Sequence, residues 1–306
     1  MRAAVFGAVA SAVLWAHSVS LGLSVGTGTS SLTCIASGLL CGHVYRPGLH
    51  IWLDRLVQAL ECLGLAACIS LAGGIASYAA AACSNGFVDA QLSAVDVAMG
   101  FDWVGYWRLT HHYPVVFDIL RFGYNSIFLY PSLLVIALCF AGDVLRAHRL
   151  LLAMLVALAV TVILFPLFPA RSAAPFYFGI NSPLLTREQV EFGAIIEALR
   201  TGSMTSIRLD KLGGIITFPS FHASCAVLFA WGGLRLRLLR SVGILLNLVM
   251  LLSTPVVGSH YFIDLVGGIA AAAMGILAAN RIPALITFLN RQPSRPRQPS
   301  STPHPC

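Results

Sequence analysis

Two histidines and an aspartate near the end of the chain have the types and spacing that phosphoryl-transfer chemistry needs. Residues 218–222 read Phe-Pro-Ser-Phe-His and residues 258–264 read Gly-Ser-His-Tyr-Phe-Ile-Asp, each where very apolar sequence meets polar sequence. His260 and Asp264 are four residues apart. In a helix from Tyr261 onward they would share one face, so that the carboxylate holds one ring nitrogen while the other points outward. An imidazole held in this way is a usable nucleophile or base.

The first segment predicts a helix start that can receive phosphate. Pro219 is expected at an early helical position, because it precedes an apolar run and proline is favoured there. The free backbone N–H groups around Ser220 to His222 would then face whatever lies at the helix start. Helix N-termini attract phosphate, so His222 is expected beside a bound anion.

Together the two segments resemble the second and third signature motifs of the type 2 phosphatidic acid phosphatase superfamily. The second motif there usually reads Pro-Ser-Gly-His. The Phe-Pro-Ser-Phe-His form, followed by Gly-x-His-Tyr-x-x-Asp, is similar to the branch that contains inositol phosphorylceramide synthases and their bacterial relatives. The resemblance covers roughly the last two thirds of the chain. The segment Gly-Phe-Asp-Trp at 100–103 is a weaker match further upstream.

The sequence departs from the family pattern at its arginines. The first motif of the family is a lysine, six residues and then Arg-Pro, and only Arg171 can be matched to it. The third motif usually begins with Ser-Arg, where this chain has Ser253-Thr254. A phosphate-gripping arginine is therefore absent from that position.

The resemblance implies a covalent mechanism. A neutral His260 would attack phosphorus and form a phosphohistidine, while Asp264 orients its ring. His222 would give a proton to the departing oxygen, then activate water or an acceptor alcohol. No metal and no cofactor is required. The expected phosphate ligands are Arg171, Ser220, Phe221, Lys211 and, as a further candidate, Arg208.

Each assignment has a structural alternative. His260 and Asp264 could be an inert hydrogen-bonded pair, although ionisable groups at the ends of membrane spans are more often functional. Arg171 could be an interfacial anchor, and Lys211 and Arg208 could be solvated. The two histidines and the carboxylate are also a familiar metal-ligand set.

Composition indicates a membrane protein built only from helices. Of 306 residues, 58% are hydrophobic and 10% are charged, against about a quarter charged in soluble proteins. We expect a polytopic bundle of about eight spans, with six or seven possible. The apolar stretches run roughly over 3–25, 31–45, 56–83, 123–140, 150–168, 220–234, 241–257 and 262–282.

Arginines predict the orientation. The net charge of +7 comes almost wholly from arginine, with Lys211 the only lysine, which is a signal of topology rather than of nucleic-acid binding. With eight spans the arginine-rich loops share one side, which is cytoplasmic by the positive-inside rule and would hold both termini. The two motifs then face the opposite side, the periplasm or exterior of an inner membrane. The arginines expected on the cytoplasmic side are Arg2, Arg46, Arg55, Arg146, Arg149, Arg235, Arg237, Arg240, Arg281, Arg291, Arg295 and Arg297.

Three regions are expected along the chain. Residues 1–100 hold N-terminal spans and a connecting segment, 101–290 form the catalytic membrane domain, and 291–306 are a disordered basic tail rich in Pro and Ser. The first apolar run is interpreted as a retained helix, with a cleaved signal peptide as the alternative. The scattered cysteines are expected to be small buried hydrophobes.

Two segments on the outer side could cover a lipid headgroup. Residues 84–122 carry the aromatic side chains typical of a membrane interface. Residues 169–217 predict an amphipathic helix, with Thr186 and Gln189 spaced as a capping box. Val190, Ile195, Ile196 and Leu199 are expected on its apolar side.

The sequence predicts an integral membrane lipid-phosphate phosphatase, with a phosphotransferase as the alternative. The two activities differ only in whether water or an alcohol attacks the phosphoenzyme. A non-enzymatic transporter or lipid-phosphate binder on the same scaffold is the alternative of another class. The partners expected are a membrane lipid phosphate and the bilayer; the lipid's identity and the oligomeric state stay open.

Overall fold

The computed structural model describes residues 1–24 and 50–289, except for the side chains of Lys211 and of residues 282–289. The expected span over 31–45 and the tail over 291–306 lie outside the described residues.

The regular structure of the described chain is almost entirely helical, as predicted from its composition. The one pair of strands among the described residues, β1 (Gly22–Ser24) and β2 (Ser206–Arg208), is parallel and was not expected. The helices are α1 (Arg2–Ser18), α3 (Ile51–Ala82), α4 (Asp89–Ala98), α5 (Trp103–His112), α6 (Pro114–Asn125), α7 (Tyr130–Phe140), α8 (Val144–Leu164), α9 (Ala173–Phe178), α10 (Arg187–Arg200), α11 (Phe221–Gly233), α12 (Arg240–Val257) and α13 (Phe262–Leu289).

Among the described residues, fewer helices can cross a membrane than the eight spans expected for the whole chain. In the described part of the chain four are long and apolar enough: α3, α8 with its 3₁₀ extension to Leu167, α12 and α13. A fifth would be α6 and α7 together, which meet at a bend of 57°. The 13 residues of α11 extend only about 20 Å, against a hydrocarbon core of about 30 Å. Hydropathy identified these apolar segments, but it did not predict where each helix breaks.

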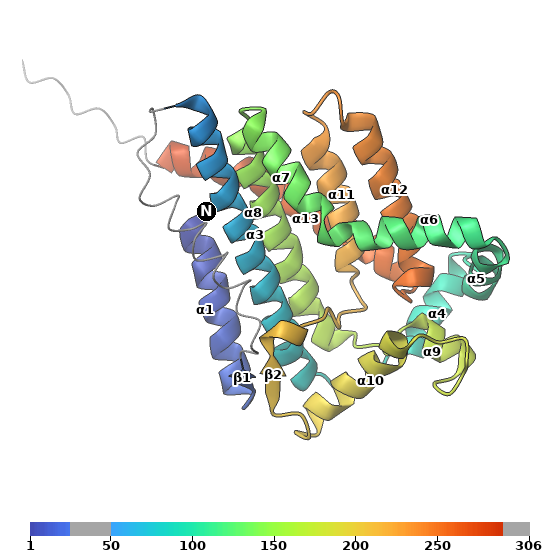
Figure 1. Ribbon diagram of the computed structural model, residues 1–306. Coiled ribbons are helices and arrows are strands. Elements are labelled where there is room, and N and C mark those ends of the chain that lie inside the picture. Colours follow the sequence, from blue (N-terminus) through green and yellow to red (C-terminus); the bar gives the residue numbers. More distant parts are fainter. Residues whose placement is uncertain (25–49, 290–306) are drawn as a thin grey trace, which may run out of the picture.

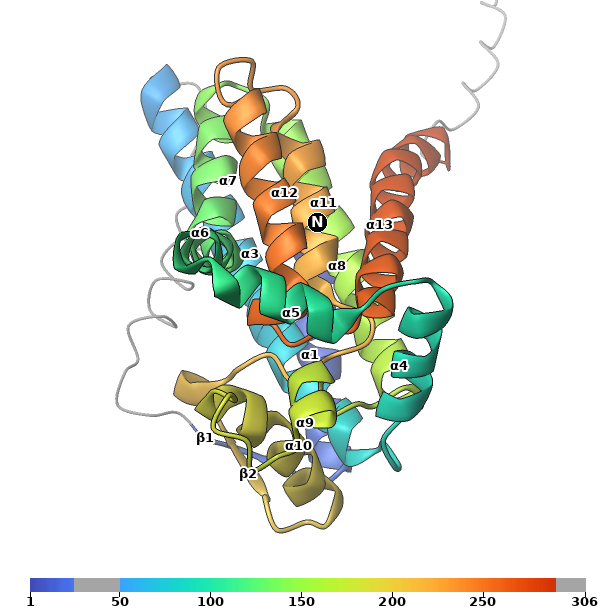
Figure 2. The ribbon, with the colours of Figure 1, turned by 90° about the vertical axis from the view of Figure 1, so that its right-hand side faces the viewer.

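Figures 1 and 2 show the arrangement: α3, α7, α8, α11, α12 and α13 stand side by side, and α6 runs crosswise against α12. The short helices α4, α9 and α10 gather at one end of the bundle. The loop between α11 and α12 lies at the other end. Helix α11 starts at the end that holds the short helices, and α12 finishes there. Both signature segments therefore lie beside α4, α9 and α10.

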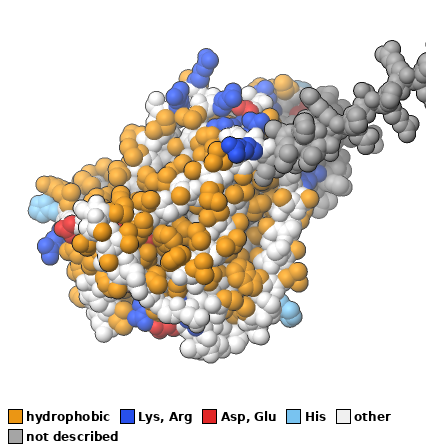
Figure 3. All heavy atoms as spheres, turned by 180° about the vertical axis from the view of Figure 1, so that it is seen from behind, with side chains coloured by type: hydrophobic (Ala, Val, Ile, Leu, Met, Phe, Trp, Pro, Cys, Tyr) orange, Lys and Arg blue, Asp and Glu red, His pale blue; other side chains and the backbone are white. Residues whose placement is uncertain are grey.

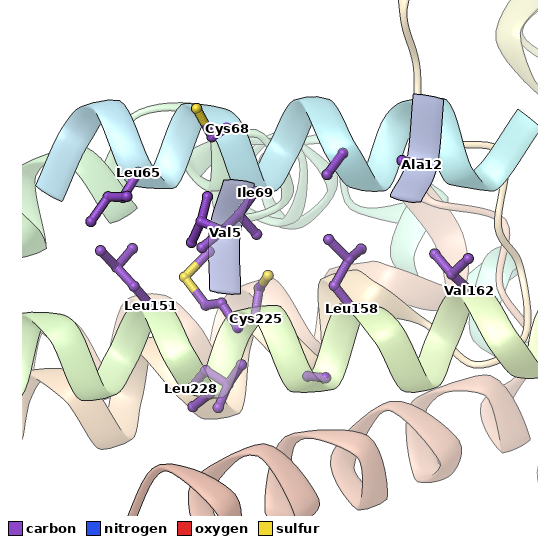
Figure 4. Packing of buried hydrophobic residues seen from close by; sticks show 14 of the residues in the cluster. Val5, Ala12, Leu65, Cys68, Ile69, Leu151, Leu158, Val162, Cys225 and Leu228 are labelled. Carbon is purple, nitrogen blue, oxygen red and sulfur yellow. The ribbon is translucent and has the colours of Figure 1, made fainter. Parts of the chain in front are cut away.

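The core is packed between long helices. Figure 4 shows Leu65 and Ile69 of α3 facing Leu151 and Leu158 of α8, all of them buried. Val5 of α1, which is fully buried, lies against the same layer. Burying each such side chain contributes about 1.5–3 kcal/mol relative to leaving it in water, although in a bilayer close packing replaces much of that term.

Hydrophobic side chains also cover much of the outside. Figure 3 shows them over the middle of one face, with Lys and Arg gathered mainly toward the upper rim. Arg146, at the start of α8, belongs to the arginine-rich end: it donates to the carbonyl of Trp231 and lies over that ring, 3.7 Å from its centre. The arginine-rich loops and the signature segments therefore lie at opposite ends of the described helices.

Helix α10 confirms its predicted capping box. Thr186 Oγ1 accepts from the Gln189 N–H at 3.4 Å, and Gln189 Oε1 accepts from the Thr186 N–H at 3.0 Å. Ile196 and Leu199 are buried as expected, but Val190 is 40% exposed, so its assignment to the buried face was wrong. Gly193, opposite Arg171, takes part in the buried face instead.

Candidate active site

The first signature segment forms the start of α11. Ser220 is the N-cap: its Oγ accepts from the Ala223 N–H at 3.3 Å, and its side chain is fully buried. Pro219 therefore precedes the cap and is not in the helix, which corrects the prediction. The serine side chain supplies the acceptor that the helix start needs, so the helix begins one residue after it.

The second segment is the turn that leads into α13. His260 Nδ1 lies 3.1 Å from Asp264 Oδ2, which is the hydrogen bond that the four-residue spacing predicts. The helix begins at Phe262 rather than at Tyr261, because Asp264 Oδ2 also accepts from the Tyr261 N–H at 3.0 Å and closes the turn. Asp264 is fully buried and His260 is 4% exposed.

These contacts determine which ring nitrogen of His260 is free to react. Because Nδ1 faces a carboxylate, it carries the proton, and Nε2 keeps its lone pair. Ser220 Oγ lies 3.4 Å from Nε2, so the start of α11 meets the reactive side of the ring. Ser220 N–H also donates to the Asp264 carbonyl at 3.0 Å, which ties the two segments together.

His222 lies in the same neighbourhood, held by stacking. Its ring lies on Tyr124 of α6, with centres 4.1 Å apart and an interplanar angle of 7°. A Cβ added to Gly258 would approach both Tyr124 Cε2 (2.7 Å) and His260 Cδ2 (2.8 Å), so Tyr124 reaches from His222 toward His260. The His222 Nε2 atom is buried and has no hydrogen-bond partner among the described residues. A buried polar atom of this kind is free for a ligand.

Close helix contact sets the distance between the two segments. A Cβ on Gly268 of α13 would lie 2.3 Å from the Ser220 carbonyl oxygen, so only glycine permits the approach. Ser224 Oγ donates to the Gly268 carbonyl at 2.8 Å and holds α11 against α13 there.

We expect Gly268→Ala to separate Ser220 from His260. The backbone must move, which typically costs about 1–3 kcal/mol of stability, and displacement of reacting groups by about 1 Å can lower kcat about 100-fold. Thermal unfolding and turnover of the purified variant measure the two effects. Gly7→Ala on α1, where an added Cβ meets nothing within 4 Å, is the matched control. Unchanged turnover in Gly268→Ala would contradict the role of this contact.

Two buried carboxylates of α4, which sequence reasoning missed, hold the turn before α13. Asp96 accepts from the N–H groups of Phe262 (2.7 Å) and Ile263 (2.8 Å). Asp89 accepts from the Tyr261 hydroxyl at 2.9 Å. Burial raises the pKa of Asp96, although these backbone donors oppose the shift. Burial, followed by the charge and hydrogen bond of Asp89, raises the pKa of the Tyr261 hydroxyl, which stays a donor.

The loop that carries Arg171 joins the same network. The backbone N–H groups of Arg171 and Ser172 donate to Asp89 at 3.0 and 3.2 Å. Ser259 accepts from the next two backbone N–H groups of the loop. Its carbonyl accepts from Ala173 N–H at 2.8 Å, and its Oγ accepts from Ala174 N–H at 2.7 Å. Ser172 has φ 116° and Ser259 has φ 57°, both unusual for serine. Such backbone conformations are concentrated at functional sites.

The upstream Gly-Phe-Asp-Trp segment contacts the same turn. Asp102 caps α5 by accepting from the Gly105 N–H at 2.9 Å. The indole N–H of Trp103 then donates to the His260 carbonyl at 3.0 Å, and Trp103 is 1% exposed. A tryptophan buried with its N–H satisfied fixes the position of the backbone it contacts.

The expected phosphate ligands are not all brought to the histidines. Ser220 is in contact with His260, and Phe221 is the first residue of α11. Arg171 lies over the Phe87 ring and pairs with Glu197 of α10, with no described contact to either histidine. Arg208 pairs with Asp210 at 2.6 Å, and the side chain of Lys211 lies outside the described residues.

Within residues 1–24 and 50–289, no cluster of three or more His, Cys, Asp or Glu side chains could hold a metal ion.

Comparison with known proteins places the chain in a family. A family model described as the PAP2 superfamily matches residues 90–278, which include both signature segments, the Arg171 loop and all of α4 except its first residue, Asp89. No curated protein and no solved structure matches the chain significantly. Because the match extends over more than half of the sequence, the chain belongs to the PAP2 superfamily.

Proposed function

We propose that the protein is a membrane lipid-phosphate phosphatase that works through a phosphohistidine at the non-cytoplasmic face. Membership of the PAP2 superfamily supports phosphatase-type chemistry on a lipid phosphate. The geometry of His260, Asp264, Ser220 and His222 supports the route. The partners proposed are a membrane lipid phosphate and the bilayer, with no nucleic acid.

His260 is the proposed nucleophile. Its Nε2 lone pair attacks phosphorus, an N–P bond forms and the bond from phosphorus to the lipid oxygen breaks. The ring becomes cationic in this step, and Asp264, at 3.1 Å from Nδ1, stabilises that charge. The proposed donors to the phosphoryl oxygens are the N–H groups of Phe221 and His222 and the Ser220 hydroxyl, because the N–H groups of Ser220 and Ala223 are already bonded.

His222 is the proposed acid and base. The ring takes up a proton beside the negative charge of the bound phosphate and gives it to the departing lipid oxygen, which leaves as an alcohol. The neutral ring then takes a proton from water, whose oxygen attacks phosphorus while the N–P bond breaks. Inorganic phosphate leaves, and both histidines return to their starting states.

One observation carries the proposal. The Nε2 atom of His260 faces the start of α11, 3.4 Å from Ser220 Oγ, and the buried Nε2 of His222 two residues later has no partner. An oriented nucleophile, an unpaired proton carrier and a helix N-terminus thus converge, which suits a tetrahedral anion better than an inert packing role.

The arginines of the short loops support the proposed orientation, whereas Arg171, Arg187, Arg200 and Arg208 lie in the longer segment at the site end. Arg146 lies in the first turn of α8 and Arg240 begins α12, and both helices start at the end of the bundle away from His260 (Figure 1). By the positive-inside rule this end is cytoplasmic, so the site opens toward the periplasm or exterior.

A substrate panel tests the function. Purified protein in detergent is incubated with phosphatidic acid, isoprenoid diphosphate, sphingoid phosphate and phosphatidylinositol, and free phosphate and new phospholipid are followed. We expect release of inorganic phosphate from at least one monophosphate or diphosphate lipid. New phospholipid without free phosphate would assign a phosphotransferase, and binding with neither product would assign a lipid-phosphate binder.

We propose that Arg171 breaks its ion pair with Glu197 and binds the substrate phosphate. Both side chains of this pair are more than a third exposed, and exposed pairs contribute only about 0–1 kcal/mol, so a phosphate can compete for the guanidinium. We expect Arg171→Ala to raise KM about tenfold, because a charge-assisted hydrogen bond contributes about 1.5–3 kcal/mol.

Glu197→Gln provides the opposite change, since it releases Arg171, and we expect it to lower KM. Glu191→Gln, which breaks the exposed pair with Arg187 on the same helix, is the matched control and leaves KM unchanged. If Glu197→Gln raises KM, Arg171 acts as a structural anchor and not as a phosphate ligand.

A further inference from the structure

The short helix α4 presents two acidic residues to the His260 turn. Asp89 and Asp96 are seven residues apart, which is about two helical turns, so they lie on the same side of α4. Asp96 is fully buried and Asp89 is 6% exposed, in a chain with only 12 acidic residues. Buried carboxylates are costly unless fully hydrogen-bonded, so their contacts indicate what they do.

Asp96 acts as the N-cap of a helix to which it does not belong. Its Oδ2 and Oδ1 accept from Phe262 N–H and Ile263 N–H at 2.7 and 2.8 Å, the first two residues of α13. The residue before the helix, Tyr261, has no short polar side chain that could cap it. The start of α13 is therefore positioned by α4, and Asp264 lies two residues further along that first turn.

Asp89 attaches the same turn to the Arg171 loop. Its Oδ1 accepts from the Tyr261 hydroxyl at 2.9 Å and from Ser172 N–H at 3.2 Å, and its Oδ2 accepts from Arg171 N–H at 3.0 Å. One carboxylate thus joins the turn that holds His260 to the loop that carries the only arginine matched to the family's first motif.

We propose that Asp96 and Asp89 are positioning residues, which hold the His260 turn and the Arg171 loop in the geometry that phosphoryl transfer needs. This inference rests on the proposed function. Neither carboxylate has a described contact with His260 Nε2 or His222, so they act through Phe262, Tyr261 and Arg171. The direct bond from Asp264 to His260 then has a rigid base, and the nucleophile points at the start of α11 before substrate arrives.

Graded substitution of Asp96 tests the inference. Asp96→Asn keeps one acceptor oxygen but turns an NH2 group toward the second backbone donor, whereas Asp96→Leu removes both acceptors and keeps the branched shape. We expect kcat for phosphate release from short-chain phosphatidic acid to fall about tenfold in the first variant and about 100-fold in the second, with KM changed less than about threefold. Asp89→Asn should raise KM as well, because the Arg171 loop loses its acceptor.

The matched control is Asp143→Asn. Asp143 caps α8 in the same way, accepting from Arg146 N–H at 3.2 Å, but at the other end of the bundle. We expect normal kcat and KM for this variant, so any general cost of removing a helix cap is separated from an effect on the site.

A second measurement reports on the structure of the His260 turn directly and does not depend on turnover. In the full-length protein in detergent, hydrogen exchange of residues 258–266 should accelerate at least about tenfold in Asp96→Leu, with the rest of the chain unchanged. Carbethoxylation of His260, followed on its peptide by mass spectrometry, should accelerate similarly because the 4% exposed ring becomes accessible.

The outcomes are distinct. Faster local exchange with unchanged kcat would overturn the inference, as would a uniform rise in exchange over the whole chain, which marks a purely structural role. If the wild-type protein releases no phosphate, the proposed function fails, and exchange and carbethoxylation still decide whether α4 holds the turn. Unchanged values in both would overturn the inference on their own.

Discussion

Replacing His260 with alanine is expected to abolish phosphate release, with a loss in kcat of at least about 10³-fold, because no other group can take the place of a covalent nucleophile. The substitution removes the ring that lies between Asp264 and Ser220. Turnover of the lipid substrate found in the panel assay measures the loss. The fold should persist, since α13 is still capped by Asp96.

The same variant tests the covalent intermediate. Wild-type protein quenched during turnover of ³²P-labelled substrate should carry label that is acid-labile and base-stable, as a phosphoramidate is, and His260→Ala should carry none. Base-labile label would indicate a carboxylate nucleophile instead. His148→Ala is the control: this histidine of α8 bonds to the Val144 carbonyl at 3.0 Å, at the arginine-rich end. Full activity of His260→Ala would refute the mechanism.

Replacing His222 with alanine is expected to lower kcat by about 10²–10⁴-fold for an alkyl phosphate, the usual contribution of a positioned acid or base. Its Nε2 is the buried atom without a partner, and its ring position depends on Tyr124. For p-nitrophenyl phosphate the loss at the first step should be much smaller, because that leaving group departs without a proton. The ratio of the two losses, from single-turnover kinetics, is the measurement.

Tyr124 allows a matched comparison for His222. Tyr124→Phe keeps the stacked ring and should retain most of the activity, whereas Tyr124→Ala removes the surface on which His222 lies and should lose activity selectively for alkyl phosphates. Equal losses for both substrates in His222→Ala would indicate that this histidine binds phosphate and does not protonate the leaving group.

The sequence alone was sufficient for features that depend on near neighbours. A cap needs an acceptor about three residues from its donor, so the capping box at Thr186 could be predicted. The spacing of four also indicated the bond from His260 to Asp264, although His260 lies in the turn before α13 and not in the helix. The all-helical class followed from composition, because only satisfied backbone is tolerated in lipid. The helix start at Pro219 was misplaced by two residues, because the capping capacity of Ser220 outweighed the preference of proline.

Tertiary structure alone decided which distant groups meet. Asp89 and Asp96 precede the His260 turn by more than 160 residues, and their pairing depends on how α4 packs at the end of the bundle. Three further contacts could not be predicted from the neighbouring sequence. Tyr124 stacks on His222, Trp103 donates to the His260 carbonyl, and Arg171 pairs with Glu197. Such contacts result from close approaches like that of Gly268 to Ser220. Hydropathy could not predict the helix breaks either, since apolar residues suit a short, a bent and a spanning helix equally.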